Sequence, residues 1–281
     1  MKRITAILIV LIVGAIINSS CTQGTKTVTL RFKYEPGTIL YYEQLSKSHK
    51  KVMENDSVVR EASHTYTVDI VMEVKGFTDD TTAEVFEKAT WEFIEPNKED
   101  TTKLDTTEKV QEILFKTLPN GKIVNFEFTE KEDPIRYQLL KNYYEQGLPV
   151  FPDGEKPVGY NWTQSTRVLL PGETMEASTT YQIKSLVRES GYDCAVIEYT
   201  GNLILPILPN PKDSLQKSGI ERIQSNGLLY FAYKEGLVVL QKENWSIEGD
   251  MQRIKGDKKE PFKILSEYDV TYALKKKETG G

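Results

Sequence analysis

The chain has 281 residues, of which 36 are basic and 41 are acidic, so its formal net charge is −5. Apolar residues make up 39% of it, which is enough to bury a sizeable core. The acidic balance gives nucleic-acid binding little electrostatic support, and the short basic run Lys275–Lys277 is typical of a solvated surface. We therefore expect no nucleic-acid partner.

The first residues have the pattern of an export signal. Lys2 and Arg3 precede an apolar run from Ile4 to Ile17, which is shorter than the about 20 residues that a comfortable membrane span needs. Small residues follow this run and lead directly to Cys21. We predict a signal peptide over residues 1–20, whose removal would change the formal charge to −7 because Lys2 and Arg3 are lost. The alternatives are an ordinary signal peptide with an incidental Cys21, or an uncleaved anchor.

The residues around Cys21 resemble the lipobox of bacterial lipoproteins. The departure from that pattern is Asn18, where the family usually has an aliphatic residue. The resemblance implies that the Cys21 sulfur carries palmitate or another acyl chain, that residues 21–27 form a lipidated tether, and that a membrane is the partner. Thr22 stands where enteric bacteria use Asp to retain a lipoprotein at the inner membrane, so the resemblance favours the outer membrane, reached through the periplasm, and leaves either face of that membrane open.

Alternation of apolar and polar residues with period two predicts antiparallel β-strands. The longest such stripe runs from Tyr66 to Val74, and others occupy residues 28–34 and 262–272. Turn signals separate the runs, at Asn55-Asp56-Ser57, Pro119-Asn120-Gly121, Pro171-Gly172 and Lys234-Glu235-Gly236. The fold class is therefore mainly β, an antiparallel curved sheet or half-barrel over residues 28–275. One domain or two are both compatible with this length, and a terminal strand is expected over about 261–274.

One segment, over about residues 133–146, is predicted to be a helix that links the two halves of the chain. Asp133 and Pro134 open it in the usual order of a cap followed by proline, and Gly147 is a natural stop. Two other segments are harder to assign. Thr106–Leu118 fits a helix at its start and a hairpin strand at its end, which we favour, and the prolines of Pro206–Asn226 predict a loop.

A short motif occurs twice, as EASHTY at residues 61–66 and as EASTTY at residues 176–181. The final tyrosines are 115 residues apart, and the same distance separates Gly121 from Gly236. We predict an approximate internal repeat over about residues 28–130 and 155–250. Chance similarity between amphipathic strands is the alternative.

The duplicated motif also argues against a catalytic pair formed by Ser63 and His64. The second copy has Thr179 in place of His64, and adjacent residues of a strand point to opposite faces of the sheet. We therefore interpret both copies as the polar start of a long strand.

No pattern of catalytic or metal-binding residues stands out elsewhere. The histidines are His49 and His64 alone, and no Cys-x-x-Cys, Gly-x-Ser-x-Gly or glycine-rich phosphate loop occurs. Cys194 lies in an apolar run and is interpreted as a buried structural thiol. We predict no catalytic residue, no metal and no cofactor. A hydrolase is the distant alternative, because two cooperating carboxylates need not be close in sequence.

Aromatic residues fill β cores and also line ligand cavities. The best candidates for a cavity are Tyr143, Tyr144 and Trp162, because they flank the interruption between the two repeats. This choice rests on their position in the chain alone.

Three stretches resemble a family of uncharacterised bacterial lipoproteins with a duplicated all-β domain, namely Tyr34–Tyr42, Lys156–Trp162 and Gly227–Val238. The family has no assigned activity, so the resemblance carries no catalytic residue to this chain. More remotely, a lipoprotein with a curved sheet is similar to the lipid-binding lipoproteins LolA and LolB. We expect a non-enzymatic, lipid-anchored envelope protein that binds an apolar ligand or lipid. The alternative is a structural or assembly role, in contact with envelope proteins or polysaccharide.

Overall fold

The structure is a computed structural model that describes residues 26–96, 104–129, 148–170, 173–207, 216–255 and 258–279. It also describes residues 137, 141, 144, 145 and 209. Cys21 and Tyr143, two of the residues singled out above, lie outside the described residues, as do the predicted signal peptide and most of the tether.

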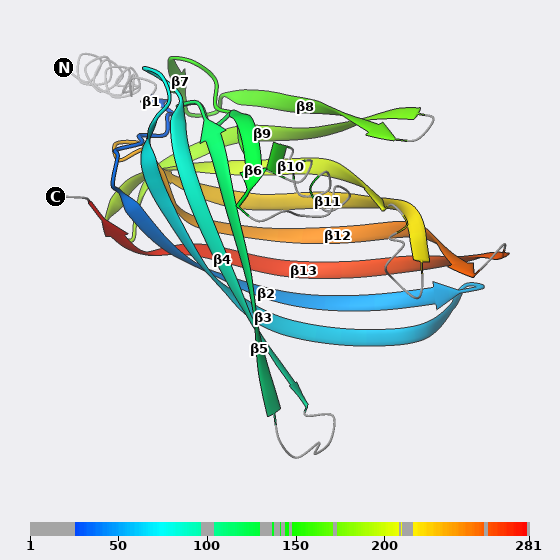
Figure 1. Cartoon of the computed structure of the whole chain (residues 1–281). Helices are drawn as coiled ribbons and strands as arrows, with labels where there is room; N and C mark the ends of the chain where they lie inside the picture. Colours follow the sequence, from blue (N-terminus) through cyan, green and yellow to red (C-terminus); the bar gives the residue numbers. More distant parts are fainter. Residues whose placement is uncertain are drawn as a thin grey trace, which may run out of the picture.

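The described residues confirm a mainly β fold (Figure 1). The strands are β1 (Thr27–Thr29), β2 (Ile39–Glu54), β3 (Ser57–Phe77), β4 (Ala83–Pro96), β5 (Leu104–Thr117), β6 (Ile123–Phe128), β7 (Glu155–Pro157), β8 (Asn161–Leu170), β9 (Glu173–Glu189), β10 (Tyr192–Ile207), β11 (Gln216–Ala232), β12 (Leu237–Lys255) and β13 (Lys258–Glu278). They form one eleven-stranded sheet in the order β6-β5-β4-β3-β2-β13-β12-β11-β10-β9-β8, and a separate pair of β1 with β7. All pairings are antiparallel, and the large sheet is strongly curved without closing into a barrel.

Two series of hairpins build this sheet. Consecutive strands from β2 to β6 pair with one another, and so do consecutive strands from β8 to β12. The duplicated motif lies in β3 and in β9, which are the second strands of their series. This arrangement is what an internal repeat predicts, although the repeat itself stays a prediction. The last strand, β13, lies between β2 and β12 and joins the two series.

Two turns show why the hairpins form at the predicted places. Asn55 and Asp56 connect β2 to β3 with φ values of 49° and 60°, a conformation that these two residue types tolerate well. Gly236 connects β11 to β12 with a φ of 67°, and a Cβ there would lie 2.4 Å from the backbone nitrogen of Lys33. Glycine at this position therefore lets another segment of the chain approach the turn closely.

The stripe at residues 28–34 is only partly a strand. The pairing of β1 with β7 ends at Thr29, and the next residues bond to hairpin turns instead of to a neighbouring strand. Phe32 donates its backbone N–H to the Pro119 carbonyl at 2.7 Å, and Lys33 donates to the Gly236 carbonyl at 3.1 Å. Apolar and polar residues nevertheless alternate here, because one side of this extended segment, which includes Leu30, is buried.

Both segments that were hard to assign form strands. Thr106–Thr117 belongs to β5, so the helical interpretation of its start is wrong. The predicted loop at Pro206–Asn226 is also largely wrong, because β10 continues to Ile207 and β11 begins at Gln216. Pairing with β4 and with β12 provides the hydrogen bonds that local sequence preference does not anticipate.

Of the predicted linking helix, the structure describes Tyr137, Lys141, Tyr144 and Glu145, and each is helical. Lys141 and Glu145 form an ion pair at 3.8 Å, at the four-residue spacing of a helix. These residues agree with the predicted helix, whose other residues lie outside the described part.

An aromatic cluster closes one end of the curved sheet. Phe231 on β11 is fully buried, and its ring contacts Phe32 and Phe151 with centroid distances of 5.2 Å and 4.7 Å. Phe151 also donates its backbone N–H to the Asn120 carbonyl at 2.8 Å. The cluster therefore joins the segment before β2, the turn after β5 and the segment before β7 to the inner face of the second series.

We predict that Phe231→Ala lowers the free energy of unfolding by about 3–5 kcal/mol, because it removes a fully buried ring and leaves a void. Phe77→Ala is the matched control, since the Phe77 side chain is half exposed at the end of β3, and it should cost less than about 1 kcal/mol. Urea unfolding followed by tryptophan fluorescence measures both. Equal losses in the two variants would show that the cluster does not stabilise the sheet.

Candidate functional site

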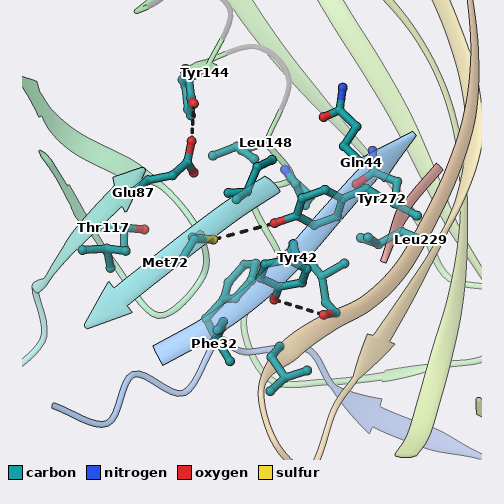
Figure 2. Close-up of a pocket in the computed structure, with 18 of the residues that line it drawn as sticks. Phe32, Tyr42, Gln44, Met72, Glu87, Thr117, Tyr144, Leu148, Leu229 and Tyr272 are labelled. Atoms are coloured by element: carbon teal, nitrogen blue, oxygen red, sulfur yellow. Dashed lines mark hydrogen bonds between the residues drawn. The ribbon is translucent and has the colours of Figure 1, made fainter. Parts of the chain in front are cut away.

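The inner face of the curved sheet encloses a cavity of about 260 Å³. Its walls come from both series of strands: Leu40, Ile70 and Val85 lie on one side, and Tyr199 and Leu229 lie on the other. Figure 2 shows part of this lining, in which apolar and aromatic side chains surround a few polar groups. Such a composition is typical of pockets that hold small apolar molecules.

The segment between the two series is attached to both edges of the sheet. On the first series, the Tyr137 hydroxyl donates to the Phe126 carbonyl of β6 at 2.8 Å. On the second series, Gln164 of β8 donates to the Leu148 carbonyl at 3.2 Å and accepts from the Val150 N–H at 2.9 Å. Leu148 itself lines the cavity, so this segment closes part of the gap between the two edges.

Of the three aromatic residues predicted for a cavity, Tyr144 lines it, whereas Trp162 lies on β8 beside Tyr181, its register partner on β9. The Trp162 ring stacks on Tyr181, a lining residue, with a centroid distance of 5.0 Å. Its indole N–H donates to the Val150 carbonyl at 3.1 Å. Tyr143 lies outside the described residues.

Glu87 is the buried carboxyl of the cavity. It lies on β4, and the Tyr144 hydroxyl donates to its Oε1 at 2.6 Å (Figure 2). Burial raises the pKa of Glu87, and this hydrogen bond opposes the rise only in part. Within the described part of the chain, no basic side chain forms an ion pair with Glu87.

Two stacked tyrosines lie in the cavity wall beside this carboxyl. The rings of Tyr42 and Tyr272 have a centroid distance of 4.4 Å, and their hydroxyls donate to the Val238 carbonyl and to the Met72 sulfur at 3.1 Å and 3.7 Å. Burial raises the pKa of both phenols, and the nearby charge of Glu87 contributes to this rise. Both rings are therefore neutral at physiological pH and present aromatic surface to the cavity.

A second carboxyl, Glu243 on β12, lies among the lining residues of the other series. The Tyr199 hydroxyl and the Gln241 amide, the latter at 3.0 Å, both donate to its Oε2. Gln241 also donates to the Tyr199 oxygen at 2.9 Å. Glu243 is only partly buried, so its network is satisfied by protein donors and by access to water.

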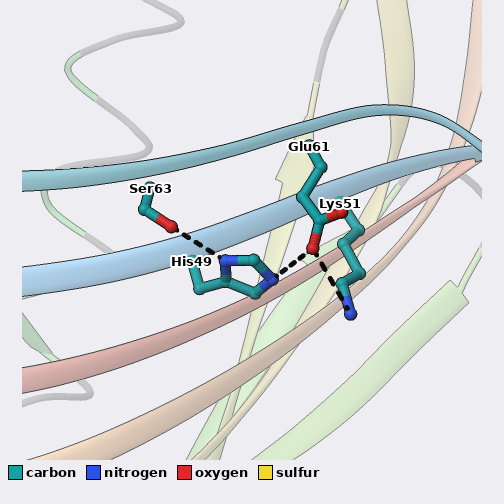
Figure 3. A network of polar contacts seen from close by, with 4 residues as sticks. All are labelled: His49, Lys51, Glu61 and Ser63. Atoms are coloured by element: carbon teal, nitrogen blue, oxygen red, sulfur yellow. Dashed lines mark hydrogen bonds and ion pairs between the residues drawn. The ribbon is translucent and has the colours of Figure 1, made fainter.

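The outer face carries a network that contains the residue types of a catalytic triad. Ser63 Oγ lies 3.0 Å from His49 Nδ1, and His49 Nε2 lies 2.9 Å from Glu61 Oε1, with Lys51 at 3.7 Å from the same oxygen (Figure 3). Ser63 thus meets His49, not His64. The network lies on the regular pairing of β2 with β3, and the side chains of His49 and Glu61 are 39% and 51% exposed. Exposed cross-strand pairs of this kind contribute little stability.

Cys194 is buried and unpaired, as predicted for a structural thiol. Burial raises the pKa of its thiol to about 11, so the reactive thiolate is scarce at physiological pH. The described ranges contain no group of three or more His, Cys, Asp and Glu side chains placed to hold a metal ion. Among the same residues, no helix has the length and apolar character needed to cross a membrane.

No protein-family model and no curated protein sequence matches this chain. The resemblance to the lipoprotein family and the similarity to LolA and LolB therefore stay predictions.

We predict that Glu87→Gln raises the melting temperature increasingly as pH rises. A carboxyl whose pKa is raised in the folded state stabilises that state below its usual pKa, about 4.5, and loses this contribution as pH rises through the folded-state value. Glutamine cannot lose a proton, so the variant and the wild type should diverge from acid to neutral pH. Thermal melts across this range measure the difference.

The matched control is Glu92→Gln, on the same strand but exposed. Its melting temperature relative to that of the wild type should not increase with pH. A constant offset between Glu87→Gln and the wild type would contradict the assigned burial of the carboxyl.

Proposed function

We propose that this chain is a lipid-anchored, non-enzymatic protein of the cell envelope, whose curved sheet binds an apolar ligand or lipid. The observation that carries the proposal is the cavity of about 260 Å³ on the inner face, lined mainly by aliphatic and aromatic side chains. Its volume lies just below the roughly 300–1,000 Å³ range of small-molecule pockets, which suits a small ligand. A cavity with such a wall favours apolar occupants over water, since water needs several polar partners.

One unsatisfied group supports occupancy by a ligand with some polar character. Thr38 lines the cavity and is 5% exposed, and its hydroxyl oxygen has no hydrogen-bond partner within the described part of the chain. An unpaired buried hydroxyl costs about 1–3 kcal/mol, which a polar atom of a bound ligand would offset.

An assembly role is the second candidate. The edge strands β6 and β8 each have one paired neighbour in the described sheet, and such edges can accept a strand from another protein. In that case the cavity would be incidental to function, and filling it would leave the partner bound.

We expect Val270→Trp to weaken the binding of N-phenylnaphthylamine, a neutral apolar probe, by about tenfold or more. Val270 lies on the central strand β13 and lines the cavity, so a larger side chain there occupies the space of the ligand. Fluorescence titration of the full chain carrying Cys21→Ser, which removes the proposed acylation site, measures the affinity.

Leu265→Trp is the matched control, because Leu265 lies on the same strand but on the outer face and is 37% exposed. It should leave the affinity unchanged. The carrier proposal is wrong if the unsubstituted cavity does not take up the probe, or if both tryptophan variants bind it equally well.

The anchor proposal has its own test. Cells fed an alkyne analogue of palmitate should label the wild-type protein and Cys194→Ser, but not Cys21→Ser. The comparison is informative because Cys194 is buried, so only Cys21 is proposed to carry the acyl chain. Label on Cys21→Ser, or none on the wild type, would refute acylation at Cys21, and outer-membrane location would then lose its support.

A further inference from the structure

We propose that Glu87 anchors the head group of the ligand, and that the ligand is a single-tailed amphiphile with a protonated amine. The inference rests on the proposed function, since it names the class of molecule that the same cavity takes. Three observations carry it: a buried carboxyl without a cation among the described residues, aromatic rings beside that carboxyl, and apolar side chains that line much of the cavity.

The first observation concerns the charge of Glu87. Its side chain is buried, and the Tyr144 hydroxyl is its one hydrogen-bond donor among the described residues. An ionised carboxylate in such a place is costly unless a cation or several donors compensate it. The described residues supply a single neutral donor, at Oε1, so the charge of Glu87 is only partly compensated until a ligand supplies the rest.

The second observation concerns the surroundings of the carboxyl. Glu87 pairs in register with Met72 on β3, and both residues line the cavity. The stacked rings of Tyr42 and Tyr272 lie near enough for the charge of Glu87 to affect their pKa values. Aromatic faces attract ammonium groups, and the attraction grows when the site is shielded from water. A carboxylate beside such rings therefore recognises an amine better than it recognises a neutral or an anionic group.

The third observation concerns the tail. Leu40, Ile70, Leu229 and Leu237 line the rest of the cavity and offer an apolar wall to a hydrocarbon chain. The volume of about 260 Å³ favours one chain over the two or more chains of a membrane phospholipid. Each buried methylene group adds to the affinity, so the tail supplies affinity and the head supplies selectivity.

Three other charged groups line the cavity, namely Lys33, Glu243 and Lys277, and water can reach each of them. Lys33 is exposed, and its ammonium group donates to the Lys234 carbonyl at 2.5 Å. Glu243 has two protein donors and partial access to water. Lys277 is partly exposed, so water can compensate its charge as well. An anionic head at Lys277 is the competing arrangement, and a carboxylate ligand tests it directly.

The experiment compares three ligands with one tail length, namely decylamine, decanol and decanoate, as competitors of N-phenylnaphthylamine at neutral pH. The protein is the full chain carrying Cys21→Ser. We expect decylamine to bind about tenfold more tightly than decanol, and decanoate to bind most weakly, because the amine alone forms a charge-assisted hydrogen bond with Glu87. Glu87→Gln should bring the amine to within about threefold of decanol and leave decanol nearly unchanged.

Glu92→Gln is the control for overall charge, because it removes the same charge from the outer face of the same strand. It should keep the preference for the amine. The inference is overturned if decanol or decanoate binds as tightly as decylamine, or if Glu87→Gln keeps the preference, and the apolar cavity of the proposed function then still stands. If none of the three ligands displaces the probe and the probe itself does not bind, both proposals fall.

Discussion

The pairing of β13 with two strands that are far apart in the sequence is the constraint on which the rest of the structure depends. Residues Lys263–Glu278 of β13 pair with β2, and residues Lys258–Ala273 of β13 pair with β12. Each series of hairpins can form locally, but neither alone makes a wall on both sides of the cavity. The chain therefore completes its inner face only when its last strand has paired, which makes the cavity a product of long-range order.

The curvature of the sheet creates the cavity on its inner face. A right-handed twist accumulates over eleven strands, and the aromatic cluster around Phe231 holds one end closed while the segment near Leu148 bridges the two edges. Core packing and cavity lining then share residues: Tyr181 supports Trp162 on one side and faces the cavity on the other. Changes that enlarge the cavity should for this reason also loosen the fold.

The fold class could be predicted from sequence because alternation of apolar and polar residues is a local signal, and the turns at Asn55 and Gly236 were marked by residue type. Strand β5 was ambiguous because its hydrogen-bond partners lie in other strands. The cavity was only partly foreseen, through Tyr144. Glu87 was not predicted to be a site residue. It lies two residues from both Val85 and Ala89 along β4, so its side chain is on the same inward face of the sheet, and this spacing could have identified it. Tyr272 was missed because its partner Tyr42 is 230 residues away in the chain.

Glu87 interrupts the buried apolar residues Ala83, Val85 and Ala89 on the inward face of β4. An apolar residue at that position would extend the inward stripe of β4 and would remove the cost of a buried carboxyl. The Tyr144 hydrogen bond reduces this cost but also draws the linking segment onto the carboxyl. A residue that is expected to lower stability and still receives a dedicated donor, at the wall of a mainly apolar cavity, is better explained by a ligand than by the fold.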